Sequence, residues 1–406
     1  MNATPQIAII ADDLTGAADT GACFAGLGLV TSVALAPDSL PTCDVLVLST
    51  ESRHLTREQA VAHVQSATAR VGNATWVYKK IDSTLRGHIA AELAATMDVL
   101  NEDRALVAPA FPAEGRTTVL GCQRIAGIPI EQTSFGKEVS CSDLYTTLSR
   151  GLPNKVVQLI PLEVVRRSHP SLEETLELRR PGVFIADAET DVDLTKIARA
   201  AMNARVRLLC GSAGLARAIA RIIAFVPDVH PAPIPICCDG PIMVVAGSRH
   251  EITIRQVEFA QKHGAVVLVP EPSFLDDNNE VAKAALIDRA TQTLADGRDL
   301  ILTTIGLPEC QLGSQFVADQ LARAVGIVVK TTRLGGLVLT GGDLATAVCN
   351  ALGANVLWLH GEVQPGIAWG TLTGNEFSAL PIVTKAGGFG ADPALWSATT
   401  FLRGLH

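Results

Sequence analysis

The sequence predicts an α/β protein with two domains, each built on a mainly parallel sheet flanked by helices. Short runs of Val, Ile and Leu alternate with longer helical stretches, which is the pattern of parallel strands buried on both faces. The 406 residues suffice for two hydrophobic cores. A Pro-rich segment at 229–241 indicates an extended linker, because proline sustains neither a helix nor a central strand. We therefore expect domains at 1–228 and 242–406.

The predicted strands are short apolar runs bounded by small, polar or turn-forming residues. In chain order they cover residues 7–11, 30–35, 44–49, 76–81, 182–187, 206–210, 241–247, 265–270, 300–305, 336–341, 355–360 and 381–387. Helical spacing follows the first strand as far as Gly28 and recurs at 56–72 and 87–100. The less regular stretch at 109–160, rich in Gly, Thr and Pro, is predicted to hold a hairpin within 119–130.

The charge balance argues against nucleic acid or an anionic membrane as a partner. Lys and Arg number 33 against 41 Asp and Glu, a net charge of −8 with no basic stripe. The nine cysteines are dispersed without CxxC spacing, which is typical of reduced thiols in the cytoplasm. The start lacks a signal-peptide pattern, and no apolar run is long enough to span a membrane. We expect a cytoplasmic protein.

Ligands of open α/β sheets bind beyond the carboxyl ends of the strands, so polar residues that directly follow apolar runs are the candidates. The first such place is Asp12 and Asp13, after the run at 7–11. A helix cap explains one of these carboxylates but not both. Because neighbouring side chains diverge after a strand, we expect one to cap the helix and the other to face a ligand.

A second place is the segment "YKKIDSTLRGHI", residues 78–89, which packs cations, hydroxyls and a carboxylate into a few positions. A surface turn could be equally polar, but this mixture suits a small hydroxylated carboxylate. The candidates from this segment and from the end of the strand at 44–49 are Lys80, Asp82, Ser83, Arg86 and Arg53.

Three turns in the second half follow predicted strands. Ser248 begins one of them, and free amides at the start of the next helix would favour a phosphate. The alternative is a capping box formed by Ser248 and Glu251, and the two roles can coexist. The Gly pairs and triplets of the other two turns would let backbone approach a phosphate closely. These candidates are Gly341, Gly342, Gly387, Gly388, Phe389 and Gly390.

Asp343 lies in a predicted first helical turn, where it either activates a hydroxyl or complements the helix dipole. Several signatures are missing from the sequence. It contains no GxxxxGK[ST], no GxGxxG after the first strand, no GxSxG and no HExxH or dense His/Cys cluster. Two glycine-rich turns plus a Gly-Ser turn in one half therefore indicate a nucleotide site of another kind.

With these motifs in view, the chain resembles the four-carbon acid sugar kinase family over essentially its whole length. The resemblance rests on IADDLTGAADTG, YKKIDSTLRGHI, VVAGSRHEIT, LTGGDLATAV and TKAGGFGADPAL, in this order. It implies an amino-terminal sugar-acid domain, a carboxyl-terminal ATP domain and an active site in the cleft between them. It further implies phosphorylation of the terminal hydroxyl of D-threonate, D-erythronate or a 3-oxo-tetronate.

The resemblance also implies roles for particular residues. Substrate contacts fall on Asp12, Arg53 and the run Lys80 to Ser83, which includes Ile81; ATP contacts fall on Ser248, Gly342 and Gly387 to Gly390. Oxo-tetronate kinases are similar but tend to have phenylalanine where this chain has Leu14, which favours D-threonate, with D-erythronate as the alternative.

As a mechanism we expect Lys80 and Arg86 to hold the substrate carboxylate while Asp12 and Asp82 orient its hydroxyls. Backbone amides at 341–342 and 387–390 would hold ATP, with Mg²⁺ bridging its phosphate oxygens through ligands that are unknown. The proton acceptor is either Asp12 or Asp343. The rivals are a cytosolic sugar-acid sensor without catalysis and, more weakly, an NAD-dependent dehydrogenase. We expect no partner beyond the two small molecules, apart from a second copy in a homodimer.

Overall fold

The computed structural model describes residues 4–36, 40–178, 181–224, 239–307, 313–375, 377 and 379–404. These form two compact units. The first contains residues 4–33 and 41–224, and the second contains 239–404 together with the short segment 34–36 and 40. No sequence pattern predicted that this segment would join the second unit. Most of the predicted linker at 229–241 lies outside the described residues, so that boundary stays a prediction.

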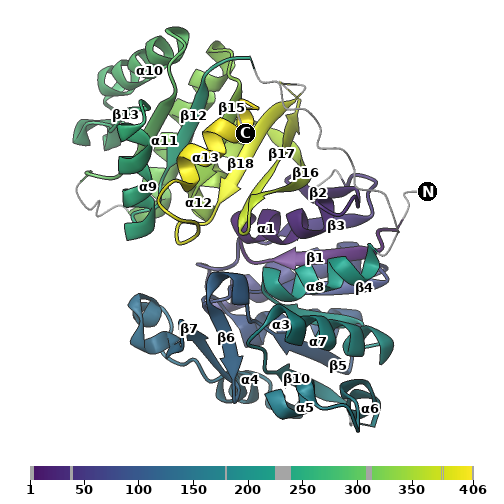
Figure 1. The fold of residues 1–406 in the computed structure, drawn as a ribbon. Helices are drawn as coiled ribbons and strands as arrows, with labels where there is room; N and C mark the ends of the chain where they lie inside the picture. Colours follow the sequence, from purple (N-terminus) through teal and green to yellow (C-terminus); the bar gives the residue numbers. More distant parts are fainter. Residues whose placement is uncertain are drawn as a thin grey trace. The chain divides into compact units, whose positions relative to one another are not determined.

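The first unit is built on a sheet of eight neighbouring strands (Figure 1). In spatial order they are β2 Thr31–Ala34, β3 Val45–Ser49, β1 Ile7–Ala11, β4 Trp76–Lys80, β11 Leu208–Gly211, β5 Arg104–Ala108, β10 Gly182–Ala186 and β9 Val157–Ile160. The pairings from β3 to β9 are all parallel. This order places the carboxyl ends of β3, β1 and β4 side by side.

Two groups of mutually packed helices accompany this sheet. One group contains α1 Leu14–Ala25, α8 Ala213–Ile223, α7 Asp191–Asn203 and α6 Leu172–Leu178; the other contains α2 Arg57–Val71, α3 Ile89–Leu100 and α4 Leu144–Gly151. The short α5 Leu162–Arg166 packs on α7. Every residue of α1 is buried, since its small side chains let the helix lie close to the strands.

The predicted hairpin is present and gains a third strand. β6 Arg116–Val119, β7 Cys122–Ile125 and β8 Ile128–Pro129 form a separate antiparallel sheet. The buried carboxylate of Asp187 holds its tight turn, accepting hydrogen bonds from the amides of Leu120 at 2.7 Å and Gly121 at 2.8 Å. Three short 3-10 turns flank the hairpin, η1 Pro112–Glu114, η2 Ile130–Gln132 and η3 Ser134–Lys137.

The sheet of the second unit is parallel on one side and antiparallel on the other. Its order is β13 Val266–Leu268, β14 Leu300–Thr303, β12 Ile242–Ala246, β15 Gly336–Thr340, β18 Leu380–Lys385, β17 Ile367–Gly374 and β16 Ala354–Gln364. β13 to β18 pair in parallel, whereas β16, β17 and β18 pair antiparallel. The predicted mainly parallel sheet is thus confirmed, although β17 was not among the predicted strands.

The helices of the second unit also form two packed groups. α9 Glu251–Lys262 packs on α13 Ala394–Leu402, and α11 Gly313–Thr331 packs on both α10 Glu280–Ala295 and α12 Gly342–Ala351 (Figure 1). The 3-10 turn η4 Pro272–Leu275 lies against α10. Buried residues of β12, β15 and β18 form a core with those of α9 and α13. The carboxyl ends of these three adjacent strands carry the turns predicted to bind a nucleotide.

Candidate active site

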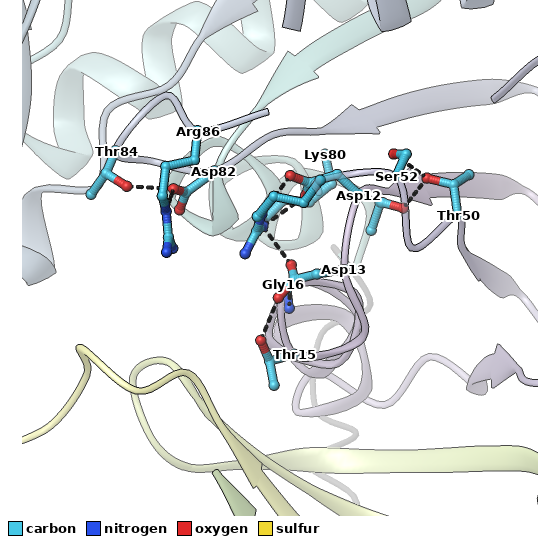
Figure 2. A network of polar contacts seen from close by, with 12 residues as sticks. Asp12, Asp13, Thr15, Gly16, Thr50, Ser52, Lys80, Asp82, Thr84 and Arg86 are labelled. Atoms are coloured by element: carbon cyan, nitrogen blue, oxygen red, sulfur yellow. Dashed lines mark hydrogen bonds and ion pairs between the residues drawn. The ribbon is translucent and has the colours of Figure 1, made fainter. Parts of the chain in front are cut away.

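The candidate residues of the first unit gather at the carboxyl ends of β1, β3 and β4 (Figure 2). Asp12 directly follows β1, Lys80 is the last residue of β4, and Asp82 and Arg86 lie in the loop after it. Arg53 lies just beyond β3. Parallel adjacency of the three strands is what brings together residues that are far apart in the sequence.

Arg53 binds both neighbouring aspartates. Its Nε donates to Asp12 Oδ2 at 2.8 Å, and its Nη2 donates to Asp12 Oδ1 at 2.8 Å and to Asp13 Oδ1 at 2.6 Å. Asp13 also caps α1, accepting from the Gly16 amide at 3.1 Å and from the Thr15 hydroxyl at 2.6 Å. The prediction that one of the two carboxylates caps the helix is confirmed for Asp13, and contact of Asp12 with a ligand stays a prediction.

Asp12 stays ionised although it is buried. Burial by itself would raise the pKa of this carboxyl, but the Arg53 guanidinium, with Lys80 and Lys79, outweighs burial and lowers the pKa. Burial opposes the charge of Arg53 as well, yet Asp12 and Asp13 raise its pKa well above the usual value. Asp12 is accordingly a permanent hydrogen-bond acceptor rather than a group poised to titrate near neutral pH.

Asp82 forms a second buried ion pair in the following loop. Arg86 Nε donates to Asp82 Oδ2 at 2.6 Å, and the Thr84 hydroxyl donates to the same oxygen. Burial would raise the pKa of Asp82, but Arg86 and Arg53 lower it well below the usual range. The Arg86 guanidinium also lies over the Phe135 ring, 5.7 Å from its centre. Only Nε of Arg86 touches Asp82, so its terminal nitrogens keep donors for a ligand.

Lys80 differs from these paired cations. The residue is 4% exposed, and within the described residues its Nζ makes neither a hydrogen bond nor an ion pair. A Cβ on Gly16 would lie 2.7 Å from Nζ and 2.5 Å from Asp13 Oδ1, so the glycine leaves room for both groups. Lys80 lies near Asp12, but a nearly buried ammonium that forms no direct ion pair is unfavourable unless a ligand brings an opposite charge into contact with it.

The neighbouring Lys79 has a structural role that the sequence reasoning did not separate from that of Lys80. It is fully buried, its Nζ lies 2.7 Å from Glu92 Oε2, and it donates to the Lys80 carbonyl at 2.9 Å. Glu92 on α3 also accepts from Ser52 Oγ at 2.7 Å. Burial would lower the pKa of Lys79, but Glu92 and Asp12 raise it. Alternation along β4 sends the two lysines to opposite faces of the sheet.

Gln123 of β7 hydrogen-bonds to the loop after β4. No sequence pattern identified this residue. Gln123 is fully buried, donates to the Ser83 carbonyl at 2.9 Å and accepts from the Thr118 hydroxyl at 2.6 Å. Ile81 is buried, and its amide donates to the Gly211 carbonyl at 2.9 Å. Direct substrate contact by Ile81 or Ser83 stays a prediction.

In the second unit, three turns meet at the carboxyl ends of β12, β15 and β18. Gly341, with φ +104°, donates to the Lys385 carbonyl at 3.1 Å, and a Cβ there would lie 3.5 Å from the Ser248 amide. A Cβ on Gly387 would lie 2.1 Å from Ser248 Oγ. These contacts bring Ser248, Gly341 and Gly387 together, and their contact with ATP stays a prediction. We call residues 386–391 the glycine loop.

The predicted capping box of Ser248 and Glu251 is wrong. The residue that caps α9 is His250, whose Nδ1 accepts from the Ile252 amide at 3.2 Å, while Ser248 Oγ accepts from the His250 amide at 3.3 Å. α9 begins two residues too late for a Ser-x-x-Glu box, because the chain first forms the Ser248 turn. His250 is thus part of the turn.

Phe389 and Gly390 complete the glycine loop, and Gly388 lies between Gly387 and Phe389. A Cβ on Gly366, in the turn between β16 and β17, would lie 2.5 Å from the Phe389 ring, so the ring rests on this bare backbone. Asp343 lies half-buried in the first turn of α12, next to Gly342. Asp12 and Asp343 belong to different units, and the choice of proton acceptor between them stays a prediction.

Two further kinds of site are absent from the described residues. None of their His, Cys, Asp and Glu side chains form a group of three or more that could hold a metal ion. Within the same ranges no helix has the length and apolar character that a membrane span requires.

Family models match both halves of the chain. A sugar-binding N-terminal domain matches residues 7–219, and a nucleotide-binding C-terminal domain matches residues 243–395. A crystal structure of a Salmonella typhimurium LT2 protein aligns over 97% of this chain and 98% of that chain with a TM-score of 0.81 and 19% identity, a likeness of fold alone. The fold and the two family models therefore define a two-domain protein with a sugar-binding and a nucleotide-binding part.

The chain belongs to the four-carbon acid sugar kinase family. It is 35% identical to a D-threonate kinase of Salmonella typhimurium, covering 99% of each chain, and 36% identical to a D-threonate kinase of Cupriavidus necator, covering 96% of each. A D-erythronate kinase of Heliobacterium modesticaldum is 30% identical over 98% of this chain and 97% of its own. The family predicted from the motifs is confirmed.

Proposed function

We propose that this protein transfers the terminal phosphoryl group of ATP to the 4-hydroxyl of D-threonate. The nearly buried ammonium of Lys80 carries the proposal, because it forms no direct ion pair within the described residues and a substrate carboxylate would supply one. The relatives named D-threonate kinase are more similar to this chain than the D-erythronate kinase is. D-erythronate and 3-oxo-tetronates are the alternative substrates.

In this proposal the first unit holds the sugar acid. Lys80 Nζ pairs with the substrate carboxylate, and the free terminal nitrogens of Arg86 donate to the same group. Asp12 orients the hydroxyls: each of its oxygens accepts from Arg53 and retains a lone pair for a substrate O–H. The low pKa of Asp12 suits an acceptor that positions the nucleophile, and a loose phosphoryl-transfer transition state demands little more from a base.

The second unit holds the nucleotide. Backbone amides of the glycine loop and of the Gly341–Gly342 turn would bind the phosphates, aided by the N-terminus of α12. Mg²⁺ binds through substrate phosphates and one or two carboxylates, and Asp343, which follows Gly342 in the first turn of α12, would supply one carboxylate to an ion that arrives with ATP. When bound, the ion would neutralise phosphate charge. The active site in an inter-domain cleft remains part of the proposal, since direct transfer requires the two substrates to meet.

A coupled ADP-release assay over D-threonate, D-erythronate, their L-isomers and 3-oxo-tetronates tests this function. The expected result is the highest kcat/KM for D-threonate, with 4-phospho-D-threonate as the product. Turnover of an oxo-tetronate alone would reassign the substrate. Absence of turnover over the whole panel, with thermal stabilisation by D-threonate but not by Mg-ATP, would instead support the sensor.

We further infer that the enzyme acts in the cytoplasm, where ATP is available, and needs no macromolecular partner. The predicted homodimer awaits a measurement of mass in solution.

A further inference from the structure

We propose that Gln256 and Lys385 are positioning residues that turn the amides of the glycine loop toward the nucleotide phosphates. The inference rests on the proposed function, because it assigns the means by which the second unit presents its anion-binding backbone. Neither residue is a glycine or lies in a turn, and neither is expected to touch ATP.

Gln256 reaches the loop from α9. It is fully buried, and its Nε2 lies 3.0 Å from the Phe389 carbonyl, 3.1 Å from that of Gly390 and 3.0 Å from that of Ala391. The Oε1 of the same side chain is buried without a hydrogen-bond partner in the described part of the chain. Leaving a buried acceptor without a hydrogen bond is costly. We infer that the hydrogen bonds from Nε2 to the loop carbonyls determine the orientation of this glutamine.

Lys385 reaches the loop from the end of β18. Its buried Nζ donates to the carbonyls of Ala386 at 2.8 Å, Gly387 at 3.2 Å and Phe389 at 3.1 Å. The Thr253 hydroxyl on α9 adds a second donor to the Gly387 carbonyl at 2.9 Å. Together with Gln256, these groups bind the carbonyls of residues 386, 387, 389, 390 and 391 from the protein side.

Because of the geometry of the peptide bond, anchoring the carbonyls also determines where the neighbouring amides point. In a planar trans peptide the C=O of one residue and the N–H of the next point in opposite directions. Holding the carbonyls of residues 386, 387 and 389 inward therefore directs the amides of Gly387, Gly388 and Gly390 outward. Within the described ranges these three amides donate to no backbone or side-chain acceptor. They are the donors that a phosphate needs.

The test compares Gln256→Met with Gln320→Met in the full-length protein. Gln320 is another buried glutamine of the second unit, on α11, whose amide donates to Asp277 away from the glycine loop. Gln256→Met should raise KM for ATP and Kd for ADP about tenfold or more while changing KM for D-threonate less than about twofold. Gln320→Met should lower Tm but leave both KM values near wild type.

Thr253→Val, which removes one donor with little change of shape, provides a milder variant should Gln256→Met fold poorly. It should raise KM for ATP by a smaller factor, again without an effect on D-threonate. The proposal is overturned if folded Gln256→Met or Thr253→Val keeps the wild-type KM for ATP, or if both KM values rise together with the loss of Tm. Turnover and ADP binding of the wild-type protein are measured first. Their absence would contradict the proposed function, whereas the variants test the positioning role of Gln256.

Discussion

At the scale of single residues, the cations of the first unit differ in whether the protein already supplies each of them with an ion-pair partner. Arg53 and Arg86 each hold a carboxylate, and Lys79 holds Glu92, whereas Lys80 has no such partner in the described chain. Its charge is therefore available to a ligand. Lys80 Nζ lies so close to the start of α1 that position 16 must be a glycine.

Gly16→Ala tests this arrangement. The added Cβ must displace Lys80 Nζ and the Asp13 carboxylate, which lie 2.7 and 2.5 Å away. Because alanine favours a helix by about 1 kcal/mol over glycine, we expect the fold to survive while KM for D-threonate rises about tenfold. Steady-state kinetics and thermal melts measure the two effects. Gly72→Ala is the control, since its Cβ would meet only ordinary contacts at 3.5 Å or more; an unchanged KM in Gly16→Ala would contradict the assignment of Lys80.

The buried carboxyl of Asp82 makes a pH-dependent contribution to stability. Its folded pKa lies well below the usual 3.8, so it contributes stability that is present above pH 3.8 and is lost as the pH falls through the folded value. Asp82→Asn should therefore be much less stable than wild type at pH 7, and the difference should shrink below about pH 4. Urea unfolding from pH 7 down to pH 3 measures it. The same series on Asp288→Asn, an exposed site, should show no such convergence; a pH-independent deficit in Asp82→Asn would count against the ion pair.

At the scale of elements, both candidate sites follow from strand order. β1, β3 and β4 are neighbours in one sheet, and β12, β15 and β18 are neighbours in the other, so turns that are remote in sequence converge. In the second unit the convergence is tight enough that Gly387 and Ser248, from two different turns, leave no room for a methyl group between them.

Gly387→Ala should consequently separate these two turns. Its Cβ would fall 2.1 Å from Ser248 Oγ and 2.8 Å from Ser248 Cβ, whereas a Cβ on Gly388 would meet only the His250 ring at 3.6 Å. We expect KM for ATP to rise about tenfold or more in Gly387→Ala and by a smaller factor in Gly388→Ala, with KM for D-threonate unchanged in both. Equal effects of the two substitutions would show that the Ser248 contact does not shape the nucleotide turns.

The sequence predicts the elements that carry apolar runs. It does not predict which polar side chains form the ion pairs and hydrogen bonds that hold the site loops in place. β1 and the two aspartates after it can be predicted from the sequence because a hydrophobic run is followed directly by two charged residues. Lys79 and Lys80 look alike in sequence, and only the partner of Lys79, Glu92 on another element, separates their roles. Gln256 sits inside an ordinary amphipathic helix, so its hydrogen bonds to the glycine loop depend on tertiary packing that no local pattern encodes.

At the scale of the whole molecule, the two units have separate ligand chemistries, and hydrogen exchange can locate each ligand. D-threonate alone should slow exchange at residues 80–88 in the first unit, while a non-hydrolysable ATP analogue with Mg²⁺ should slow exchange at 386–391 and 341–344 in the second. A ligand present at about 100 times its Kd stabilises the unit that binds it by roughly 2.7 kcal/mol, enough for a large change in protection. Lys80→Met should remove only the first effect and Gln256→Met only the second. Protection of the first unit by the nucleotide alone, at residues 80–88 and not in the glycine loop, would invert the assignment of both sites.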